Sequence, residues 1–340
     1  MDADELALII REVRAEIGHE DMEVHIAEVI FNRERDELLI VAPDRSDKSI
    51  IIGKGGWVVG RLREKLGIGS VHVESEIDLL MRRERVKFAL ERLDELKGSF
   101  RKLSLLEKPL RKRLEYPVGL EFLTEESNES SDVIEEPGAA VALSGGTDSS
   151  FSLIASFNLG LKPVAFTADP GTIVLPGHVR RAVDELTASL GVRHEYISMD
   201  FSEIQMNALE GKFHPCGRCS SLIEEAIMEK IKNEGIDTVI FGDLLSTGYG
   251  SLQVTDDILR VNLPALFAAS KQELKSAVSS YGVRAPSGFG CPLLGEVHRR
   301  YHHMRRYSIQ RILRETRAGV LEPGEALELI WSICGSRRTN

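Results

Sequence analysis

Hydrophobic residues recur along this chain with two different periods, and these divide it into segments. Near the N-terminus, apolar side chains repeat at helical spacing up to Gly18, which predicts a helix over residues 6–17. Two strand-like runs follow at 24–32 and 37–42, then two short helices joined by glycines at 48–62 and a third strand at 70–77. The predicted order is therefore α-β-β-α-α-β within an N-terminal domain of residues 1–100.

From residue 139 onward, short apolar runs alternate with helical stretches. We predict strands at 139–143, 163–167, 194–198 and 238–241, with helices between them that include 149–159 and 178–190. Such alternation predicts an α/β fold, a doubly wound parallel sheet with helices on both faces and ligands at the carboxyl ends of the strands. We expect this domain to span residues 137–295 and to be followed by basic helices at 296–340.

The stretch between these domains is dominated by charge. Residues 79–97 are helix-like and rich in arginine and lysine. Their charges either contact RNA between the domains or form a solvent-exposed helix face. Residues 124–136 are acidic, with three serines and few apolar side chains, which is typical of a flexible tether. We therefore interpret residues 101–136 as a charged linker.

Composition narrows the class of protein. A chain of 340 residues with 42% hydrophobic content is long enough for more than one core. The acidic N-terminus and the lack of a long apolar run predict a cytoplasmic protein with no membrane partner. The formal charge of −10 argues against a protein that coats nucleic acid indiscriminately. Four cysteines cannot form a disulfide framework in a chain of this size, so metal or sulfur chemistry is indicated for them.

The first predicted strand of the α/β domain runs into a glycine-rich turn that opens a helix. Glycines there let several N–H groups point into one concavity, and the helix adds the positive end of its dipole, which favours a phosphate. An ordinary turn capped by serine and aspartate is the alternative. The stretch comprises Ser144, Gly145, Gly146, Thr147, Asp148 and Ser149.

This Ser-Gly-Gly-x-Asp-Ser stretch resembles the signature of the PP-loop ATP pyrophosphatases, whose fold is of the adenine nucleotide alpha hydrolase type. The resemblance implies that ATP is cleaved between its α and β phosphates while a carbonyl oxygen is adenylated. It also implies that residues 144–149 bind ATP and that Asp148 helps to hold Mg²⁺ and pyrophosphate.

Further candidates follow other predicted strands. In families of this fold, the carboxyl ends of the strands hold adenine, ribose and magnesium. We therefore expect Thr167, Asp169 and Gly242 to contribute to the ATP site and Asp243 to be catalytic with Asp148. Aspartates that merely cap surface turns would give the same pattern.

The cysteines form a second motif, with Cys216 and Cys219 spaced as Cys-x-x-Cys and Cys291 far downstream before a proline. This arrangement in a PP-loop domain is similar to that of the iron–sulfur tRNA thiolation enzymes that make 2-thiouridine or 2-thiocytidine. The resemblance implies a 4Fe-4S cluster held by these three thiolates, with one iron left without a protein ligand. A zinc site that adds Cys334 or His214, a persulfide pair and inert buried thiols are the alternatives.

The resemblance to the thiolation enzymes is uneven. After Phe241 this chain has Gly-Asp-Leu-Leu-Ser-Thr where the 2-thiouridine enzymes carry Gly-His-Asn and two following aspartates. It also lacks the lysine that those enzymes have shortly after their second cysteine, and their accessory zinc fingers. The general acid and base and the identity of the modified base are therefore left open.

The order of helices and strands in the N-terminal domain, with a Gly-x-x-Gly loop between two helices, resembles that of a KH domain of the bacterial and archaeal type. The resemblance implies that single-stranded RNA binds at the loop, whose glycines admit a phosphodiester backbone. Glycines that only cap two helices are the alternative. The loop consists of Gly53, Lys54, Gly55 and Gly56.

The most basic stretch of the chain is 297–307, which we expect to continue as one helix beyond Arg311. Its arginines and its tyrosines, Tyr301 and Tyr307, suit phosphate contacts and base stacking in a tRNA loop. A helix with Tyr301 and Ile309 in the core is the alternative. The candidate RNA contacts are Arg299, Arg300, Arg305 and Arg306.

Together these patterns predict an ATP-dependent RNA-base thiolation enzyme that uses ATP, Mg²⁺ and a 4Fe-4S cluster, with zinc as the alternative metal. Its expected partners are tRNA or another structured RNA with an unpaired loop, and sulfide or a sulfur-donor protein; a homodimer is left open. Two other functions fit the same motifs. One is a PP-loop ligase that uses ammonia to form an amide or nitrile, and the other is an RNA-binding nucleotide sensor without catalysis.

Overall fold

The structure, a computed structural model, describes residues 2–33, 36–125, 138–283 and 288–335. It divides into two compact units, Met1–Glu84 and Arg85–Asn340. The predicted acidic tether from residue 126 to Glu136 lies outside the described residues. Within the described ranges, no helix combines the length and apolarity that a membrane span requires.

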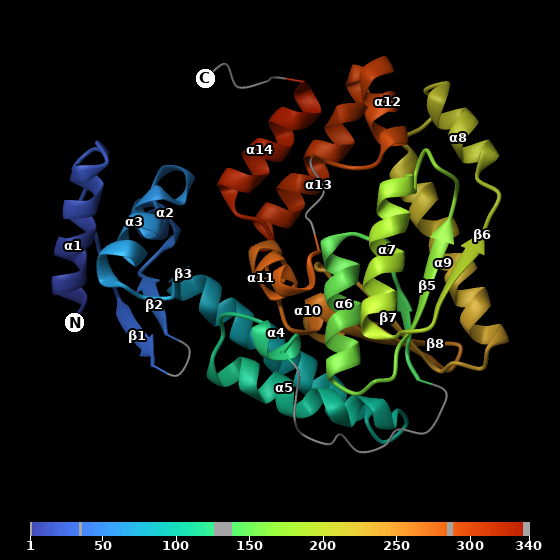
Figure 1. Ribbon diagram of the computed structural model, residues 1–340, viewed down its shortest axis with the longest axis horizontal. Helices are drawn as coiled ribbons and strands as arrows, with labels where there is room; N and C mark the ends of the chain where they lie inside the picture. The colour runs from blue at the N-terminus through green and yellow to red at the C-terminus, as the bar shows by residue number, and fades with distance from the viewer. Residues whose placement is uncertain (1, 34–35, 126–137, 284–287, 336–340) are drawn as a thin grey trace. The chain divides into compact units, whose positions relative to one another are not determined.

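The first unit is a three-stranded sheet covered by helices, in the predicted α-β-β-α-α-β order. Strand β2 is central, antiparallel to β1 and parallel to β3, and its residues Leu38, Ile40 and Ala42 pack with the helices. Figure 1 shows these elements in blue. Their bounds are α1 (Ala3–Glu16), β1 (Glu28–Asn32), β2 (Glu37–Ala42), α2 (Arg45–Ile52), α3 (Trp57–Leu66) and β3 (Ser70–Ser75).

The second unit is an α/β fold around a six-stranded sheet in the order β6-β5-β4-β7-β9-β8. Every neighbouring pair is parallel except β8 and β9, which are antiparallel. The predicted fold class is thereby confirmed for this unit. The strands are β4 (Ala140–Ala142), β5 (Val164–Asp169), β6 (His194–Ser198), β7 (Thr238–Phe241), β8 (Leu252–Thr255) and β9 (Ile258–Asn262).

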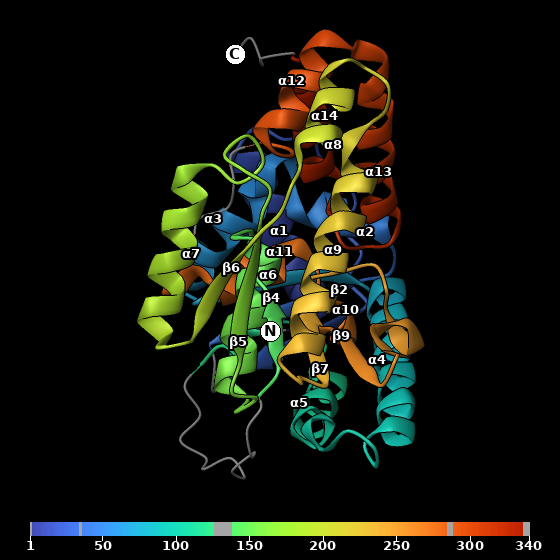
Figure 2. The same ribbon diagram turned by 90° about the vertical axis from the view of Figure 1, so that its right-hand side faces the viewer.

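Alternate residues of the central strand enter two different cores, as a sheet buried on both faces requires. Val141 packs with Phe151 of α6 (Thr147–Asn158) and with α7 (Gly177–Leu190), whereas Ala140 packs with Ile227 of α9 (Pro215–Asn233). Figures 1 and 2 show α6 and α7 on one side of the strands and α9 on the other.

The order of the strands indicates where a ligand would bind on this sheet. The chain leaves β4 toward β5 and β6 on one side, and later returns to lay β7 and β9 on the other side. In doubly wound sheets, the crevice for a ligand opens at the carboxyl ends of the strands where this reversal occurs. The reversal falls at β4, whose carboxyl end leads directly into the glycine-rich turn.

Residues 101–124 are not the linker that their charge predicted. They form α5 (Ser104–Glu115) and a short following segment, because leucines on one face of this stretch are buried in the core of the second unit. These leucines, each at most 2% exposed, are Leu103, Leu106, Leu110, Leu120 and Leu123.

One buried ion pair fixes this segment to a helix much later in the chain. Arg113 of α5, whose side chain is fully buried, donates to Glu273 of α11 (Lys271–Ala277) across 2.8 Å. Its guanidinium also donates to the carbonyl oxygens of Phe267 and Gly119. Since a buried charge is tolerated only when it is paired and hydrogen-bonded, this contact makes α5 part of the second unit.

The remaining helices are α4 (Glu76–Leu96), α8 (Ser202–Leu209), α10 (Leu263–Leu266), α12 (Pro292–Arg300), α13 (Arg305–Arg317) and α14 (Pro323–Cys334). The basic stretch expected to be one helix is therefore two, α12 and α13. The break occurs at Tyr301, whose backbone leaves the helical region and whose ring packs over Gly211. Its hydroxyl donates to the carbonyl oxygen of Leu209, so Tyr301 belongs to the core.

Candidate functional site

The glycine-rich turn after β4 has the backbone geometry of a cradle. Gly145 has φ of +76°, and a Cβ there would lie 2.6 Å from Cγ1 of Val179. At Gly242, after β7, a Cβ would lie 2.9 Å from the backbone of Asp148 and Ser149. Only glycine fits either position, because α7 and the end of β7 press directly on the turn.

Serine side chains hold the turn in shape from within. Ser149 Oγ donates to the carbonyl oxygen of Gly146 at 3.1 Å and accepts from the backbone N–H of Ser144 at the same distance. The two serine hydroxyls lie 3.0 Å apart. The first N–H groups of α6 have no side-chain cap, because the residue before the helix is Gly146. The turn therefore leaves backbone N–H donors at the start of α6 without a side-chain cap, and their contact with a phosphate stays a prediction.

Lys271 is a residue of this site that sequence reasoning missed. Its ammonium forms an ion pair with the Asp148 carboxylate, and both side chains are about one quarter exposed, at 22% and 26%. The residue follows Ser270, which with Glu273 forms a capping box that fixes the first turn of α11. The only sequence signal was that Ser-x-x-Glu pattern, which predicts a helix start but no role for its lysine.

The other predicted ATP-site residues lie at the same edge of the sheet but already have partners. Thr167 is 1% exposed, and its hydroxyl donates to the carbonyl oxygen of Leu143, so it braces the cradle from beneath. Asp169 accepts from Gly171 N and forms an ion pair with Arg180. Their contribution to ATP binding stays a prediction.

Asp243 shapes the loop after β7. One carboxylate oxygen accepts from Leu245 N at 3.0 Å and the other from Ser246 Oγ at 2.5 Å. These are the contacts of a turn-forming aspartate, which is the alternative that the sequence left open. Its catalytic role stays a prediction.

The structure brings three of the four cysteines together. Cys216 and Cys219 lie in the first turns of α9, and Cys291 immediately precedes α12; all are free thiols and partly buried. Burial, followed by the neighbouring Cys291, raises the pKa of the Cys216 thiol and raises that of Cys219 to about 12. Cys334 is exposed at the end of α14.

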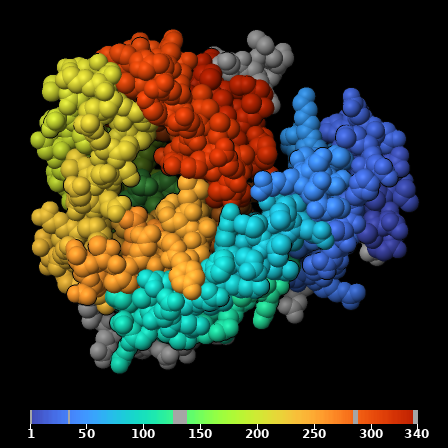
Figure 3. Space-filling model, turned by 180° about the vertical axis from the view of Figure 1, so that it is seen from behind, coloured from blue at the N-terminus to red at the C-terminus, as the bar shows by residue number. Residues whose placement is uncertain are grey.

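The cysteines lie at the carboxyl end of the strands, as the cradle does. Ile173, in the loop that follows β5 and Asp169, accepts a hydrogen bond from Leu293 N, two residues after Cys291. The side chains of Ile173, Cys219 and Cys291 share one apolar cluster. Figure 3 shows the second unit hollowed between its yellow and red segments, with green segments in the range of β4, α6 and β5 on the floor. Both motifs therefore lie beside the carboxyl edge of the sheet.

The three thiols have the donor chemistry of either candidate metal group. Among the residues that the structure describes, no three His, Cys, Asp or Glu side chains converge on a point where a single metal ion would bind. Three thiols, of which Cys219 and Cys291 belong to one apolar cluster, have the soft donor chemistry that a 4Fe-4S cluster takes and that zinc also takes. The choice between a zinc site and a 4Fe-4S cluster at these cysteines therefore stays a prediction.

His214, the other proposed zinc ligand, is engaged in a buried network. Its Nε2 lies 3.2 Å from Ser308 Oγ, which in turn lies 3.1 Å from Nε2 of His298. Burial, followed by the charges of His214 and Arg305, lowers the pKa of His298 to about 4. This network joins the start of α9 to α12 and α13, and so fixes the helices that surround the thiols.

Comparison with known proteins gives one clear relative. The uncharacterized protein MJ1638 of Methanocaldococcus jannaschii is 32% identical over 262 residues, which are 77% of this chain and 96% of that protein. This chain belongs to the same family. No protein-family model matches it.

Two solved structures resemble the chain more distantly. The U34-tRNA thiolase NcsA from Methanococcus maripaludis, solved with its 4Fe-4S cluster, has a TM-score of 0.35 and 13% identity over 61% of this chain and 74% of that one. The NMN synthetase from Francisella tularensis has a TM-score of 0.34 and 15% identity over 74% of this chain and 93% of that one. Both scores are low, so the fold is assigned from the strand order of the sheet.

The predicted RNA-contacting arginines are partly neutralised within the chain. Arg299 and Arg300 both pair with Glu296, at 2.7 and 2.6 Å, and these contacts lower the pKa of Glu296 to about 2. Arg305 donates to the carbonyl oxygen of Cys334, and Arg306 donates to the hydroxyl of Tyr307. The RNA contact at these arginines stays a prediction, as does base stacking, for which Tyr307 is exposed whereas Tyr301 is partly buried.

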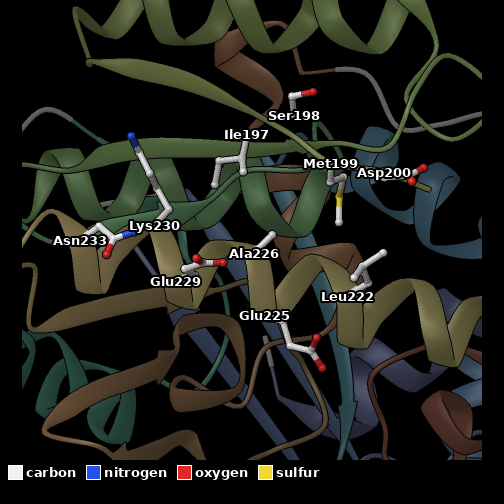
Figure 4. A pocket seen from close by; sticks show the side chains of 10 residues that line it. All are labelled: Ile197, Ser198, Met199, Asp200, Leu222, Glu225, Ala226, Glu229, Lys230 and Asn233. Carbon is white, nitrogen blue, oxygen red and sulfur yellow. The ribbon is translucent and has the colours of Figure 1, made fainter. Parts of the chain in front are cut away.

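A separate cavity of about 390 Å³ lies between the end of β6 and one face of α9. Its lining includes Asp200, Glu225 and Glu229 (Figure 4), and it contains neither a cradle residue nor a cysteine. The Asp200 carboxylate already accepts from the N–H and hydroxyl of Ser202. This cavity is therefore distinct from the candidate site.

The predicted RNA loop in the first unit is built as a tight turn. Gly53, Gly55 and Gly56 all have positive φ, and a Cβ on Gly53 would lie 2.2 Å from Cγ2 of Val58. Lys54 is exposed at the tip. The close approach of α3 at Gly53 explains why this position needs glycine.

Proposed function

We propose that this protein thiolates an RNA base in an ATP-dependent reaction. The observation that carries the proposal is the position of the three cysteines beside the carboxyl edge of the sheet, where the glycine-rich cradle also lies. The first unit supports an RNA substrate, because its element order and exposed Gly-x-x-Gly loop resemble those of a KH domain.

The cradle residues would bind and orient ATP. The N–H groups at the start of α6 would donate to the phosphates, and Lys271 would turn from Asp148 toward the charge that develops on pyrophosphate. Asp148, with phosphate oxygens, would hold Mg²⁺, which neutralises charge on the leaving pyrophosphate. A base carbonyl oxygen then attacks the α phosphate, the bond to pyrophosphate breaks, and the oxygen becomes part of AMP.

The three cysteines would hold a 4Fe-4S cluster, which when bound supplies an iron without a protein ligand to which sulfide can attach. Sulfide replaces the adenylated oxygen at the same carbon, and AMP leaves. The apolar cluster around the thiols would keep water, the competing nucleophile, away from the activated base.

The experiment separates the two half-reactions. Protein reconstituted with iron and sulfide without oxygen is incubated with ATP, Mg²⁺, sulfide and RNA, and AMP and thionucleosides are measured by chromatography and mass spectrometry. We expect Asp148→Asn to lose AMP formation by at least about 100-fold. Cys291→Ser should lose thionucleoside but keep nucleotide binding, and the matched control Cys334→Ser should keep both activities.

Two results would contradict the proposal. One is a thionucleoside yield in Cys291→Ser equal to that of the unmodified protein. The other is AMP formation that depends on ammonia and not on sulfide, which would identify an amide-forming ligase instead.

A further inference from the structure

One large apolar side chain of the first unit is exposed where folding alone would favour burial. Trp57 is 67% exposed, more than any other large hydrophobic residue in the described part of the chain. Burial of an indole removes a large apolar surface from water, so an exposed tryptophan gives up stability that a buried one would provide. Such a residue suggests a binding role.

The surroundings of Trp57 leave its indole accessible. It is the first residue of α3, directly after the Gly-x-x-Gly loop, and a Cβ on Gly55 would lie 3.3 Å from its Cδ1 atom. The indole thus lies beside the loop backbone. Gly56 before it and Gly60 one turn later carry no side chain, and a Cβ at either would meet nothing within 4 Å. These neighbours leave room for a flat ligand against the indole.

The charges of this segment select the class of ligand. Residues 48–63 contain no aspartate or glutamate, and Lys54, Arg61 and Arg63 are exposed there. Arg61 pairs with Glu64 at the edge of the segment. A flat aromatic surface within a basic segment suits a polyanion with aromatic groups, which is the chemistry of single-stranded nucleic acid.

We infer that Trp57 is a stacking platform for an unpaired RNA base, while Lys54 contacts the adjoining phosphate. The inference deepens the proposed function and rests on its RNA-binding part, not on its chemistry. Because every base has an aromatic face, stacking at Trp57 would add affinity with little preference for sequence. Sequence preference would then have to come from other contacts of the first unit.

The chain offers a direct optical test, because its only other tryptophan is Trp331. In the full-length Trp331→Phe variant, Trp57 is the sole indole, and its fluorescence is followed during titration with an unstructured RNA 12-mer. We expect saturable quenching. In the same background, Trp57→Ala, followed by anisotropy of labelled RNA, should weaken binding about ten-fold or more, whereas Trp57→Phe should keep most of the affinity.

Leu8→Ala is the matched control, because Leu8 is a 61% exposed apolar residue of α1 in the same unit; RNA affinity should be unchanged. Gly55→Asp with Gly56→Asp tests the loop itself by placing two negative charges there. If that double variant loses RNA binding while Trp57→Ala does not, the stacking inference is wrong and RNA binding stands.

Two further outcomes are distinguishable. If Trp57→Ala converts a dimer to a monomer in sedimentation and leaves RNA affinity unchanged, the indole is a contact between copies of the chain and the inference is overturned. If RNA quenches Trp57 but the unmodified protein yields no thionucleoside, the inference stands and the proposed chemistry fails.

Discussion

The ion pair between Lys271 and Asp148 joins residues that are 123 positions apart in the chain. It places an ammonium next to the start of α6, where, in the proposed function, the charge of the bound triphosphate would concentrate. A lysine is suited to this role because its compact charge on a flexible stem can leave the aspartate for a phosphate. In the proposed function, the pair is the resting arrangement that ATP would rearrange.

We expect Lys271→Ala to reduce AMP formation by about 100-fold or more, because the variant removes a cation that stabilises the departing pyrophosphate. Lys275→Ala is the matched control, since Lys275 lies one turn later on α11 and pairs with Glu325 instead. AMP release is measured for both variants. Equal rates for Lys271→Ala and the unmodified protein would show that the lysine serves only to neutralise Asp148.

Features that depend on neighbouring residues could be predicted from the sequence, whereas contacts between distant residues could not. The spacing of glycines and serines in residues 144–149 predicted the cradle, because that geometry is local. The role of Lys271 could not be predicted, because no local pattern relates it to Asp148. Nor could the local sequence show that both carboxylate oxygens of Asp243 are used within its own turn.

At the level of elements, the strands and helices around β4 agree with the predicted ones to within a few residues, because alternation and glycine caps mark their ends. The basic stretch at 297–314 was wrongly predicted as one helix. Its charge pattern is continuous, and the break at Tyr301 depends on packing over Gly211, which lies in another element. Tertiary contact, not local preference, ends α12 there.

The network of His214, Ser308 and His298 gives the elements around the thiols a dependence on pH. The pKa of His298 in the folded protein, about 4, lies below its unfolded value of about 6.5, so the unfolded chain takes up a proton first as the pH falls. This contribution to stability is complete above pH 6.5 and is lost as the pH falls toward 4.

We therefore expect the melting temperature of the unmodified protein to fall more steeply between pH 6.5 and pH 4.5 than that of His298→Gln, which can still bond Ser308 but does not titrate. The control His302→Gln changes an exposed histidine of the same region and should follow the unmodified protein. Identical slopes for all three proteins would show that His298 is not held neutral.

For the whole molecule, composition and periodicity predicted an α/β fold preceded by a small α+β sheet, and both are present. What they could not predict was which segments the larger core includes. Residues 101–124 carry many charges, and the five leucines that face inward are visible as a buried face only once the partner surface is known. The N-terminal boundary of the second unit therefore lies well before the first strand of its sheet.

Arg113 gives that boundary a practical meaning for anyone who shortens this protein. A chain begun at residue 138, where the recognisable motif starts, would leave Glu273 buried without its cation and remove five leucines worth about 2 kcal/mol each. That loss is similar to the entire stability of an ordinary domain. Expression of residues 138–340 should therefore give insoluble protein, whereas residues 85–340 should give a cooperative melting curve; a soluble, cooperatively melting 138–340 fragment would refute this. The buried leucines, and not the glycine-rich motif, therefore decide where a fragment that folds on its own can begin.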